Sequence, residues 1–342
     1  MKSAITIIDP YTGNIVAMAG DIGEKQGSRL FNYATAKRQC GSAIKPIAAY
    51  APALDNGTIT PASAIDDAPV RSLNGRAWPV NSHPYYDGLV TVDKAIASSL
   101  NPCAVRVVEG LGVQESYDFM TEKLGFSSLV SAEDNPNRND MNSASMGLGG
   151  LTRGVSTVEM AAAYATFANK GVYNEPRTYT KVTDQDGKTI LDNQADSWQA
   201  MKETTAYFMN KYLRQVITSG TGGSAGFSGM TVAGKTGTTT DNFDRYFVGD
   251  TPYYVAAVWT GYEVNVKINA SGNPSAQLFR KVMSKVHANL PNKSFFSVDS
   301  GLTNVSVCMD CGKLATGLCA ADVRGSRVHT VEVVSGTAPM ET

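Results

Sequence analysis

The sequence predicts an α+β fold in which an antiparallel sheet is flanked by helices and joined to an all-helical subdomain. Strand-like segments lie near both ends of the chain, whereas helical signals dominate from about residue 42 to residue 222. Hydrophobic residues make up 42% of the 342 residues and charged residues 18%, which suits a well-buried core. We therefore expect one sheet built from both ends of the chain, with the helical subdomain as the opposite wall of a cleft.

The N-terminal segment predicts a β-hairpin followed by a helix. Residues 3–19 alternate apolar and polar side chains around Pro10-Tyr11-Thr12-Gly13, which has the composition of a turn. The stretch up to the helix shows no regular periodicity. The apolar run from Ile44 to Tyr50 predicts a buried helix, which Pro52 should kink or end before Asn56-Gly57.

The middle of the chain contains two strong helix signals. Ser156 and Glu159 fit a capping box, and Gly171 closes the helix that follows them. A second helix over 204–219 ends at the glycine-rich stretch 220–229. This stretch follows a helix rather than a strand and lacks Gly-Lys-Ser/Thr, so we expect a flexible rim of the cleft and not a phosphate-binding loop.

The C-terminal half supplies the remaining elements and a boundary. After Pro291 the composition becomes polar and cysteine-bearing, which divides the chain into a main domain, 1–290, and a small β-rich appendage, 291–342. The other predicted elements are a hairpin over 173–193 around Asp186-Gly187, strands over 230–234 and 253–262, and a helix over 276–290 with Leu278, Val282 and Val286 on one face.

Two motifs carry the chemistry. Ser42 and Lys45 form a Ser-x-x-Lys, and residues three apart share a helix face, so the lysine amine can point at the serine hydroxyl. About one such motif is expected by chance in a chain of this length, but here a Lys-Thr-Gly follows at Lys235 on an apolar strand. Burial and the second cation would both lower the pKa of Lys45 and make it a base for Ser42. Together they predict a serine acyl-transfer site that needs no histidine.

A third element, a Ser-x-Asn, is expected between these motifs. Ser72-Leu73-Asn74 precedes a glycine and is better explained as a loop tip. Ser271-Gly272-Asn273 follows the Lys-Thr-Gly, so its order is wrong. Ser99 and Asn101 lie at the corner between two short helical stretches, which is a rigid place from which to aim side chains, and we select this pair.

Three motifs therefore occur in order: Arg38-Gln39-Cys40-Gly41-Ser42-Ala43-Ile44-Lys45-Pro46, Ser99-Leu100-Asn101, and Ala233-Gly234-Lys235-Thr236-Gly237-Thr238-Thr239. In this order they resemble the transpeptidase domain of class A (bifunctional) penicillin-binding proteins, with the serine β-lactamase/penicillin-binding transpeptidase fold. The family usually has proline where this chain has Cys40, and the pattern is similar to a subgroup from anaerobic Gram-positive bacteria. The likeness covers about residues 3–290 and includes segments 7–18, 159–171, 244–249 and 258–262.

The resemblance implies a role for each motif residue. Ser42 would attack the penultimate D-Ala carbonyl of a peptidoglycan stem peptide, and Lys45 would take the serine proton. Ser99 would pass a proton toward the leaving amine, Asn101 would hold the substrate amide, and Lys235 would supply positive potential. The Thr236 and Thr238 hydroxyls would bind the substrate carboxylate, Gly237 would let the substrate backbone approach the strand, and the backbone N–H groups of Ser42 and Thr238 would form the oxyanion hole.

The resemblance also implies partners and a location. The expected activity is a D,D-transpeptidase that β-lactams acylate on Ser42. The alternatives are a D,D-carboxypeptidase or β-lactamase on the same scaffold, a β-lactam-binding sensor without turnover, and a scaffold with a decayed site. A β-lactamase would need a water-positioning glutamate, for which Glu133 and Glu159 are the candidates by position. Family members have an N-terminal membrane anchor and a glycosyltransferase domain, so we expect this chain to be a soluble piece of a membrane-anchored parent that acts on the extracellular face of the cytoplasmic membrane.

Charge and cysteine content exclude several other classes. The net charge of −1 gives no basic footprint for nucleic acid, no apolar run is long enough to span a membrane, and His83, His287 and His329 are scattered. No cofactor or metal is expected. We hypothesise a Cys40–Cys103 disulfide, because each of these residues lies two positions from a catalytic motif. A zinc site is disfavoured relative to disulfides or free thiols for the C-terminal set Cys308, Cys311, Cys319 and His329.

Overall fold

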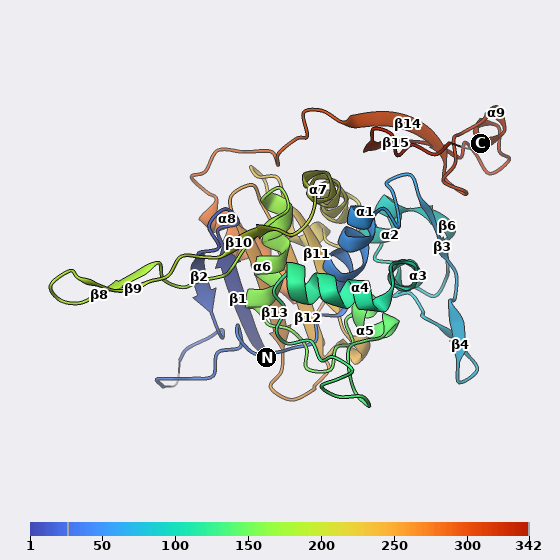
Figure 1. Cartoon of the computed structure of the whole chain (residues 1–342). Helices are drawn as coiled ribbons and strands as arrows, with labels where there is room; N and C mark the ends of the chain where they lie inside the picture. Colours follow the sequence, from blue (N-terminus) through green and yellow to red (C-terminus); the bar gives the residue numbers. More distant parts are fainter. Residues whose placement is uncertain (26, 341–342) are drawn as a thin grey trace.

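The structure, a computed structural model, describes residues 1–25 and 27–340. At its centre lies a five-stranded antiparallel sheet in the order β11-β12-β13-β1-β2 (Figure 1). Strand β1 pairs with β13 along its whole length, so the predicted assembly of the sheet from both ends of the chain is confirmed. The strands are β1 (Lys2–Ile8), β2 (Ile15–Ala19), β11 (Ala233–Thr238), β12 (Asp244–Asp250) and β13 (Val255–Gly261).

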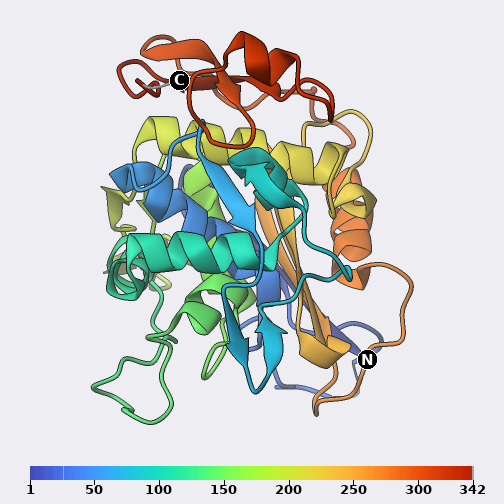
Figure 2. The same cartoon turned by 90° about the vertical axis from the view of Figure 1, so that its right-hand side faces the viewer.

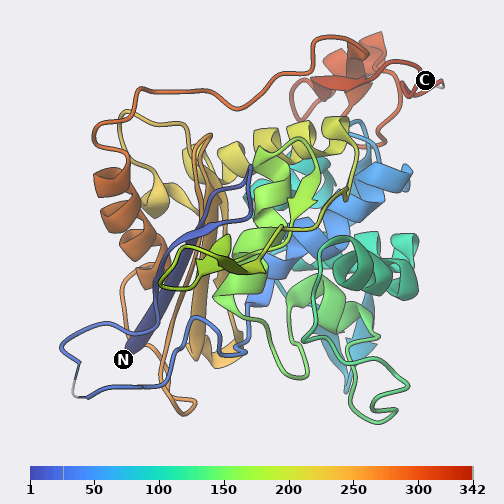
Figure 3. The same cartoon turned by 60° about the vertical axis from the view of Figure 1, so that its left-hand side comes forward.

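Different helices cover the two faces of the sheet (Figure 3). Helix α8 (Pro274–Val286) packs on one face, where the rings of Phe247 in β12 and Phe279 have centroids 4.8 Å apart. Helix α6 (Thr157–Ala168) covers the other face, and the Tyr246 hydroxyl of β12 donates a hydrogen bond of 3.1 Å to the Val155 carbonyl just before this helix. Successive residues of a strand point to opposite faces, so burial on both sides explains the nearly continuous apolar sequence of β13 and the apolar centre of β12, Tyr246 to Val248.

The helical subdomain faces the edge strand β11. Its helices are short and are joined by tight corners. They are the 3-10 turn η1 (Gly41–Ile44), the π turns η2 (Pro46–Tyr50) and η3 (Phe119–Lys123), and the α-helices α1 (Ala51–Asn56), α2 (Val92–Ala97), α3 (Asn101–Leu111), α4 (Val113–Asp118), α5 (Ser143–Leu148) and α7 (Glu203–Thr218), with the 3-10 turns η4 (Gly223–Ala225) and η5 (Thr240–Asn242) beside β11.

Pro52 does not end the helix that begins at Ser42. The helix changes from π to α winding next to it and continues to Asn56. Since proline has no N–H, the carbonyl of Ala48, four residues earlier, lacks its helical donor. The buried hydroxyl of Ser116 in α4 donates to this carbonyl at 2.6 Å, which satisfies the helix from outside and ties it to the next layer.

Four two-stranded ribbons surround the main layers. The predicted hairpin around Asp186-Gly187 is confirmed and projects from the body (Figure 1), and the ribbon that carries Ser72 lies at the lower end of the body in Figure 2. Asn74 adopts φ +51 in the turn of that ribbon, as expected for a loop tip. The pairs are β3 (Ala64–Asp67) with β6 (Gly88–Thr91), β4 (Arg71–Leu73) with β5 (Arg76–Trp78), β7 (Val172–Asn174) with β10 (Ser197–Gln199), and β8 (Lys181–Thr183) with β9 (Thr189–Asp192).

The C-terminal residues form a hairpin of β14 (Leu302–Cys308) and β15 (Val328–Val334), with the short helix α9 (Gly317–Ala320) between the strands. It reaches the top of the body through a long connection after α8 (Figure 3). Glu332 accepts hydrogen bonds of 2.8 Å from the Lys211 amine and the Tyr207 hydroxyl of α7. Across the described ranges, no helix combines the length and the apolar character needed to cross a bilayer.

The predicted apolar face of the last helix is only partly right. Helix α8 buries Phe279 and Met283 completely, whereas Leu278 and Val282 are partly buried and Val286 is 40% exposed. The buried stripe, at Phe279 and Met283, lies one position further along the helix than the predicted one, at Leu278 and Val282. Periodicity found the helix, but its register depends on the sheet that it contacts.

Candidate active site

Ser42, the predicted nucleophile, lies in η1, which packs directly against the edge strand β11. Gly41 adopts φ +52, and a Cβ on it would lie 2.4 Å from the Thr238 carbonyl oxygen. A Cβ on Gly237 would lie 2.1 Å from the carbonyl oxygen of the residue before Gly41, and one on Gly149 would lie 2.2 Å from the Gly41 carbonyl oxygen. Because a side chain does not fit at these distances, the three glycines allow the turn to touch the strand.

This packing gives Gly237 a structural role beside the one predicted for it toward the substrate. The place of its missing side chain lies against the Cys40 carbonyl oxygen, so the glycine lets η1 approach β11 closely. We predict that Gly237→Ala lowers the rate of Ser42 acylation by at least about tenfold and destabilises the fold by roughly 1–3 kcal/mol, because the turn must move away from β11. Labelling rate and thermal melting measure both effects.

A matched control is Gly110→Ala in α3, where the added Cβ meets only a Thr58 methyl at 3.7 Å. This variant should acylate normally and melt at the same or a slightly higher temperature, since alanine favours a helix interior over glycine. Unchanged labelling in Gly237→Ala would contradict the packing argument.

Lys45 is buried behind Ser42, with 1% of its surface exposed. Its amine donates to the Asn101 side-chain oxygen at 2.6 Å and to the Ser99 carbonyl at 2.7 Å, and it lies 3.4 Å from the Ser99 hydroxyl. The described hydrogen bonds include none between the Ser42 hydroxyl and this amine. The structure therefore brings Lys45 together with the selected Ser99/Asn101 pair, and it places Ser42 one turn away on the same helical segment.

Lys235 approaches the same hydroxyl from the strand. Its amine, on a fully buried side chain, donates to the Ser99 hydroxyl at 2.9 Å and to the Thr236 carbonyl at 3.2 Å. Ser99 occupies the corner between α2 and α3 and has φ +58, an uncommon conformation for a residue with a side chain. The corner thus holds the Ser99 hydroxyl between the amines of Lys45 and Lys235. Backbone strain of the kind that the positive φ of Ser99 indicates is typical of functional positions.

The electrostatics favour a neutral amine at Lys45. Burial, and after it the charge of Lys235, lower the pKa of Lys45 well below its ordinary value. Burial alone lowers the pKa of Lys235 to about 7. Two cations in a low-dielectric site repel each other, so one of them is expected to lose its proton. Lys45 is the better candidate, because both burial and the charge of Lys235 lower its pKa. These shifts favour a neutral amine at Lys45 beside a charged amine at Lys235.

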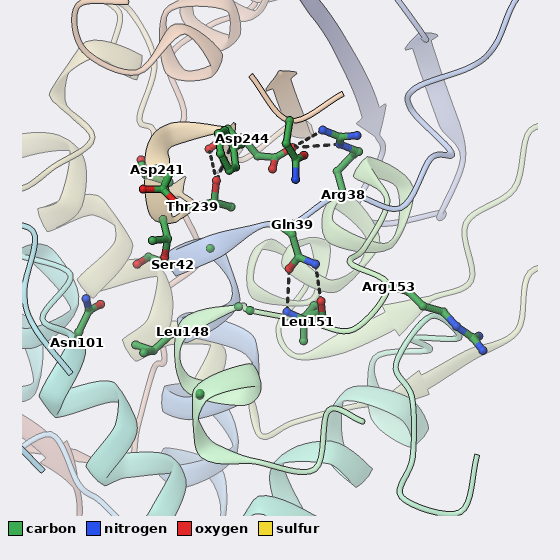
Figure 4. Close-up of a pocket in the computed structure, with 18 of the residues that line it drawn as sticks. Arg38, Gln39, Ser42, Asn101, Leu148, Leu151, Arg153, Thr239, Asp241 and Asp244 are labelled. Atoms are coloured by element: carbon green, nitrogen blue, oxygen red, sulfur yellow. Dashed lines mark hydrogen bonds and ion pairs between the residues drawn. The ribbon is translucent and has the colours of Figure 1, made fainter. Parts of the chain in front are cut away.

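Two neighbouring cavities, of about 720 and 730 Å³, share Ser42, Asn101 and Thr238 in their walls. Figure 4 shows the first, with Ser42 near Thr239 and Asp241 on one side and Asn101 and Leu148 on the other. The serine therefore opens into both spaces, which is the geometry needed for one group to be bound on each side of a reacting centre.

The first cavity carries charges of both signs. Arg38 pairs with Asp244, with 3.0 Å between the guanidinium and the carboxylate oxygen, and Arg153, also in the wall, points away from Ser42 (Figure 4). Gln39 fixes the loop opposite Ser42 by accepting a 2.8 Å hydrogen bond from the Leu151 N–H. These contacts hold the irregular segment that leads into η1 and give the cavity polar walls.

Hydroxyls and one cation line the second cavity beside β11. The Thr236 hydroxyl lies 2.9 Å from that of Thr221, and the Thr238 hydroxyl accepts a hydrogen bond of 2.8 Å from Arg245. Sequence reasoning missed Thr221, Arg245 and Asn273 as cavity residues. Thr221 belongs to the glycine-rich stretch predicted as a rim, but no local signal marked Arg245, which enters the site through strand pairing.

The predicted Cys40–Cys103 disulfide is wrong, because both residues are buried free thiols. Cys40 directly precedes η1, whereas Cys103 lies in α3, and burial raises the pKa of both. Within the described ranges, no group of three or more His, Cys, Asp or Glu side chains is arranged to hold a metal ion.

The two glutamates considered for water activation are occupied elsewhere or exposed. Glu159 completes the predicted capping box with Ser156 and forms an ion pair of 2.6 Å with Lys37. Hydrogen bonds from both partners outweigh burial and lower the pKa of Glu159. Glu133 lies in an exposed loop. Neither residue lines the two cavities at Ser42.

Comparison with known sequences gives one consistent family. The model of the "Penicillin binding protein transpeptidase domain" matches residues 3–284. Penicillin-binding protein 1A of Clostridium botulinum is 34% identical over 352 residues, which cover 99% of this chain and 41% of the relative. Penicillin-binding protein 4 of Bacillus subtilis is 33% identical over 279 residues, covering 81% and 43%. The chain thus spans about two fifths of the length of the curated relatives that it matches.

Solved structures support the same fold. Penicillin-binding protein 1A from Haemophilus influenzae aligns with a TM-score of 0.79 at 22% identity, over 100% of this chain and 54% of that one. The PonA1 protein from Mycobacterium tuberculosis, in complex with penicillin V, gives a TM-score of 0.72 at 24% identity, over 87% and 81%. The predicted α+β architecture and the resemblance stated from the motifs are both confirmed.

Proposed function

Because this chain belongs to the family of penicillin-binding protein transpeptidase domains, we propose that it is a serine D,D-transpeptidase that cross-links peptidoglycan stem peptides and is acylated by β-lactams on Ser42. One observation carries the proposal. The amines of two buried lysines converge on the Ser99 hydroxyl, beside a serine that opens into two cavities.

Acylation begins with removal of the Ser42 proton. Neutral Lys45, whose pKa is lowered by burial and by Lys235, acts as the base as the hydroxyl oxygen attacks the penultimate D-Ala carbonyl. The proton then reaches the leaving amine of the terminal D-Ala through the Ser99 hydroxyl, which contacts both lysine amines. Asn101 holds the substrate amide, and its side-chain oxygen keeps the Lys45 amine in place.

The oxyanion that forms on the carbonyl is stabilised by backbone N–H groups of Ser42 and Thr238. Contact between η1 and β11 supports this assignment, since a Cβ on Gly41 would lie 3.0 Å from the Thr238 nitrogen. Donors fixed by packing before the reaction are typically the largest electrostatic contribution to catalysis. The Thr236 and Thr238 hydroxyls bind the carboxylate of the donor peptide, and Lys235 adds positive potential.

An amine from a neighbouring stem peptide then attacks the acyl-enzyme and forms the cross-link. Water as the acceptor would make the chain a carboxypeptidase, or a β-lactamase if it released hydrolysed β-lactam. The position of Glu159 argues against the β-lactamase, because this carboxylate is held by Ser156 and Lys37 outside the cavities at Ser42.

The proposal extends to organisation and location. Residues 1–290 form the transpeptidase domain and 291–342 a small appendage, whose Val307, Val331 and Val333 are buried with Ala62 of the main body. The parent is a membrane-anchored protein that also carries a glycosyltransferase domain, and this domain acts on the extracellular face of the cytoplasmic membrane. The class A relatives, which are more than twice as long as this chain, support that organisation.

Fluorescent penicillin tests the proposed activity. After a denaturing gel and peptide mapping, we expect a stable label on Ser42 and none in Ser42→Ala, while Ser72→Ala on the exposed ribbon labels normally. Label at another residue would refute the acyl-enzyme assignment, and rapid loss of the label would favour a β-lactamase. A thioester donor incubated with and without a D-amino acid then separates transfer to an amine from hydrolysis.

A further inference from the structure

The second cavity at Ser42 is built to receive an anion. Its volume is about 730 Å³, and it is lined by Ser42, Ser99, Thr236 and Thr238 together with other neutral residues. Of the described residues in its wall, Arg245 is the only charged one, and no Asp or Glu lines it. The first cavity differs, since its wall contains both lysine and arginine side chains and the carboxylates of Asp241 and Asp244.

Arg245 is held at this cavity without a negatively charged partner. It lies on β12 directly opposite Thr238 of β11, and its guanidinium donates to the Thr238 hydroxyl at 2.8 Å. Its Nε is shielded from solvent and has no hydrogen-bond partner. Among the described ion pairs none involves Arg245, whereas Arg38 at the first cavity binds the Asp244 carboxylate at 3.0 Å.

The N-terminal end of α8 adds to the positive potential in the second cavity. Asn273 lines the same cavity and caps this 13-residue helix by accepting from the N–H groups of Ser275 and Ala276. The N-terminus of a helix carries a partial positive charge. A cation with unused donors, a hydroxyl bound to it and a helix N-terminus therefore face one space that contains no acidic side chain.

We propose that Arg245 binds the terminal carboxylate of the donor peptide next to Thr238, and that it sets the preference of this chain for donors with a free carboxylate. This inference rests on the proposed function. The guanidinium is planar and presents several donors, a geometry that matches a carboxylate, and its contact with Thr238 aligns it with the hydroxyl already assigned to that group. The carboxylate of penicillin occupies the same place when Ser42 is acylated.

A donor without the carboxylate leaves the guanidinium without an anionic partner, and its shielded Nε without an acceptor among the described residues. Charge-assisted hydrogen bonds of this kind contribute enough to change a rate by about 10- to 100-fold. The preference should therefore appear as a penalty for esterified substrates, and this penalty should depend on Arg245. A purely structural role in holding Thr238 would lower the rate for acid and ester alike.

The test compares acylation of Ser42 by penicillin and by its methyl ester, followed by intact-protein mass. In the wild type we expect the ester to react about 10- to 100-fold more slowly. In Arg245→Gln the rate with penicillin should fall by a similar factor while the rate with the ester stays nearly the same, so that the penalty almost disappears. Arg245→Lys, which keeps the charge but loses the planar fork, should restore part of the penalty.

The control is Arg280→Ala, which removes an exposed guanidinium from α8 outside the cavity and should leave both rates unchanged. Equal ester penalties in the wild type and Arg245→Gln, or equal losses with both reagents, would overturn the inference. Absence of any adduct on Ser42 in the wild type would instead refute the proposed function, so the two failures are distinguishable. Thermal melting of each variant excludes unfolding as the cause.

Discussion

Replacement of Lys45 by methionine is expected to slow acylation of Ser42 by penicillin by about 10²- to 10⁴-fold, the usual contribution of a general base. Methionine keeps much of the side-chain volume but removes the amine that contacts Ser99 and Asn101. Without it, the serine proton loses the base that is assigned to receive it. The rate constant for adduct formation, measured by stopped labelling and intact-protein mass, checks the value.

The control is Lys94→Ala in α2, the helix that leads into the Ser99 corner. Its side chain is 53% exposed and lies 3.9 Å from Asp87. This variant should acylate at the wild-type rate. A loss of less than about tenfold in Lys45→Met, with an unchanged melting temperature, would contradict the assignment of the base.

The pH dependence of acylation should be bell-shaped in the wild type. Protonation of Lys45, whose pKa is lowered well below its ordinary value, reduces the rate on the acid side. Loss of the proton from Lys235, with a pKa lowered to about 7, removes the cation on the alkaline side. Lys45→Met should lose the acid limb, because the group that titrates there is gone, and persistence of that limb would assign it to another residue.

Asp250→Asn is expected to stabilise the protein, with an effect that grows as pH rises. Asp250 ends β12, is fully buried, and has no hydrogen-bond partner for either carboxylate oxygen among the described residues. Burial raises its pKa to about 7, whereas the unfolded chain has the ordinary value. The native state therefore keeps a proton that the unfolded state has lost, and stability falls between about pH 4 and pH 7.

The size of the stability gain in Asp250→Asn follows from the difference between the native and unfolded pKa of Asp250. A difference of about three pKa units corresponds to roughly 4 kcal/mol above pH 7, and to about 1–2 kcal/mol at pH 5. Asparagine resembles the protonated acid and does not titrate, so the variant avoids this loss of stability. Urea unfolding at pH 5 and pH 8.5 should therefore show a larger gain for Asp250→Asn at the higher pH, and an equal or smaller gain there would refute the argument.

Asp244 offers a matched comparison on the same strand and the same face. Its buried carboxylate accepts from the Trp259 indole N–H at 2.8 Å and from the Arg38 guanidinium at 3.0 Å. Asp244→Asn leaves Arg38 without its counter-charge and should destabilise the protein by about 3–5 kcal/mol. The two substitutions are chemically identical and should change stability in opposite directions.

The sequence allowed the sheet and the main helices to be predicted, and it pointed to a candidate catalytic set. Ser42, Lys45 and Lys235 could be chosen because a nucleophile, a base and a second cation have characteristic spacings and local contexts. The choice of Ser99 over Ser72 rested on the helix corner, and the structure gives Ser99 the contacts with both lysines. A role that depends on a residue's immediate neighbours in the chain can be predicted from the sequence.

The place of Arg245 in the cavity and the packing role of Gly237 could not be predicted from their neighbours in the chain. Arg245 reaches the cavity because β12 pairs with β11 in a register that places it opposite Thr238, and this register is set by the whole sheet. Gly237 is required by a turn almost two hundred residues earlier in the chain. The Cys40–Cys103 pairing failed for a related reason, since proximity to motifs in sequence says nothing about which direction each thiol points.

The glycine contacts around Ser42 limit how this domain can evolve under antibiotic pressure. A side chain at position 41 or 237 would clash across the contact between η1 and β11, and one at position 149 would clash with the Gly41 backbone. Each would disturb the position of the nucleophile and slow the native reaction together with the reaction with the drug. Variants that escape β-lactams while still building cell wall are therefore expected to arise among the side chains of the cavity walls, where donor and drug can be told apart, and to spare these three positions.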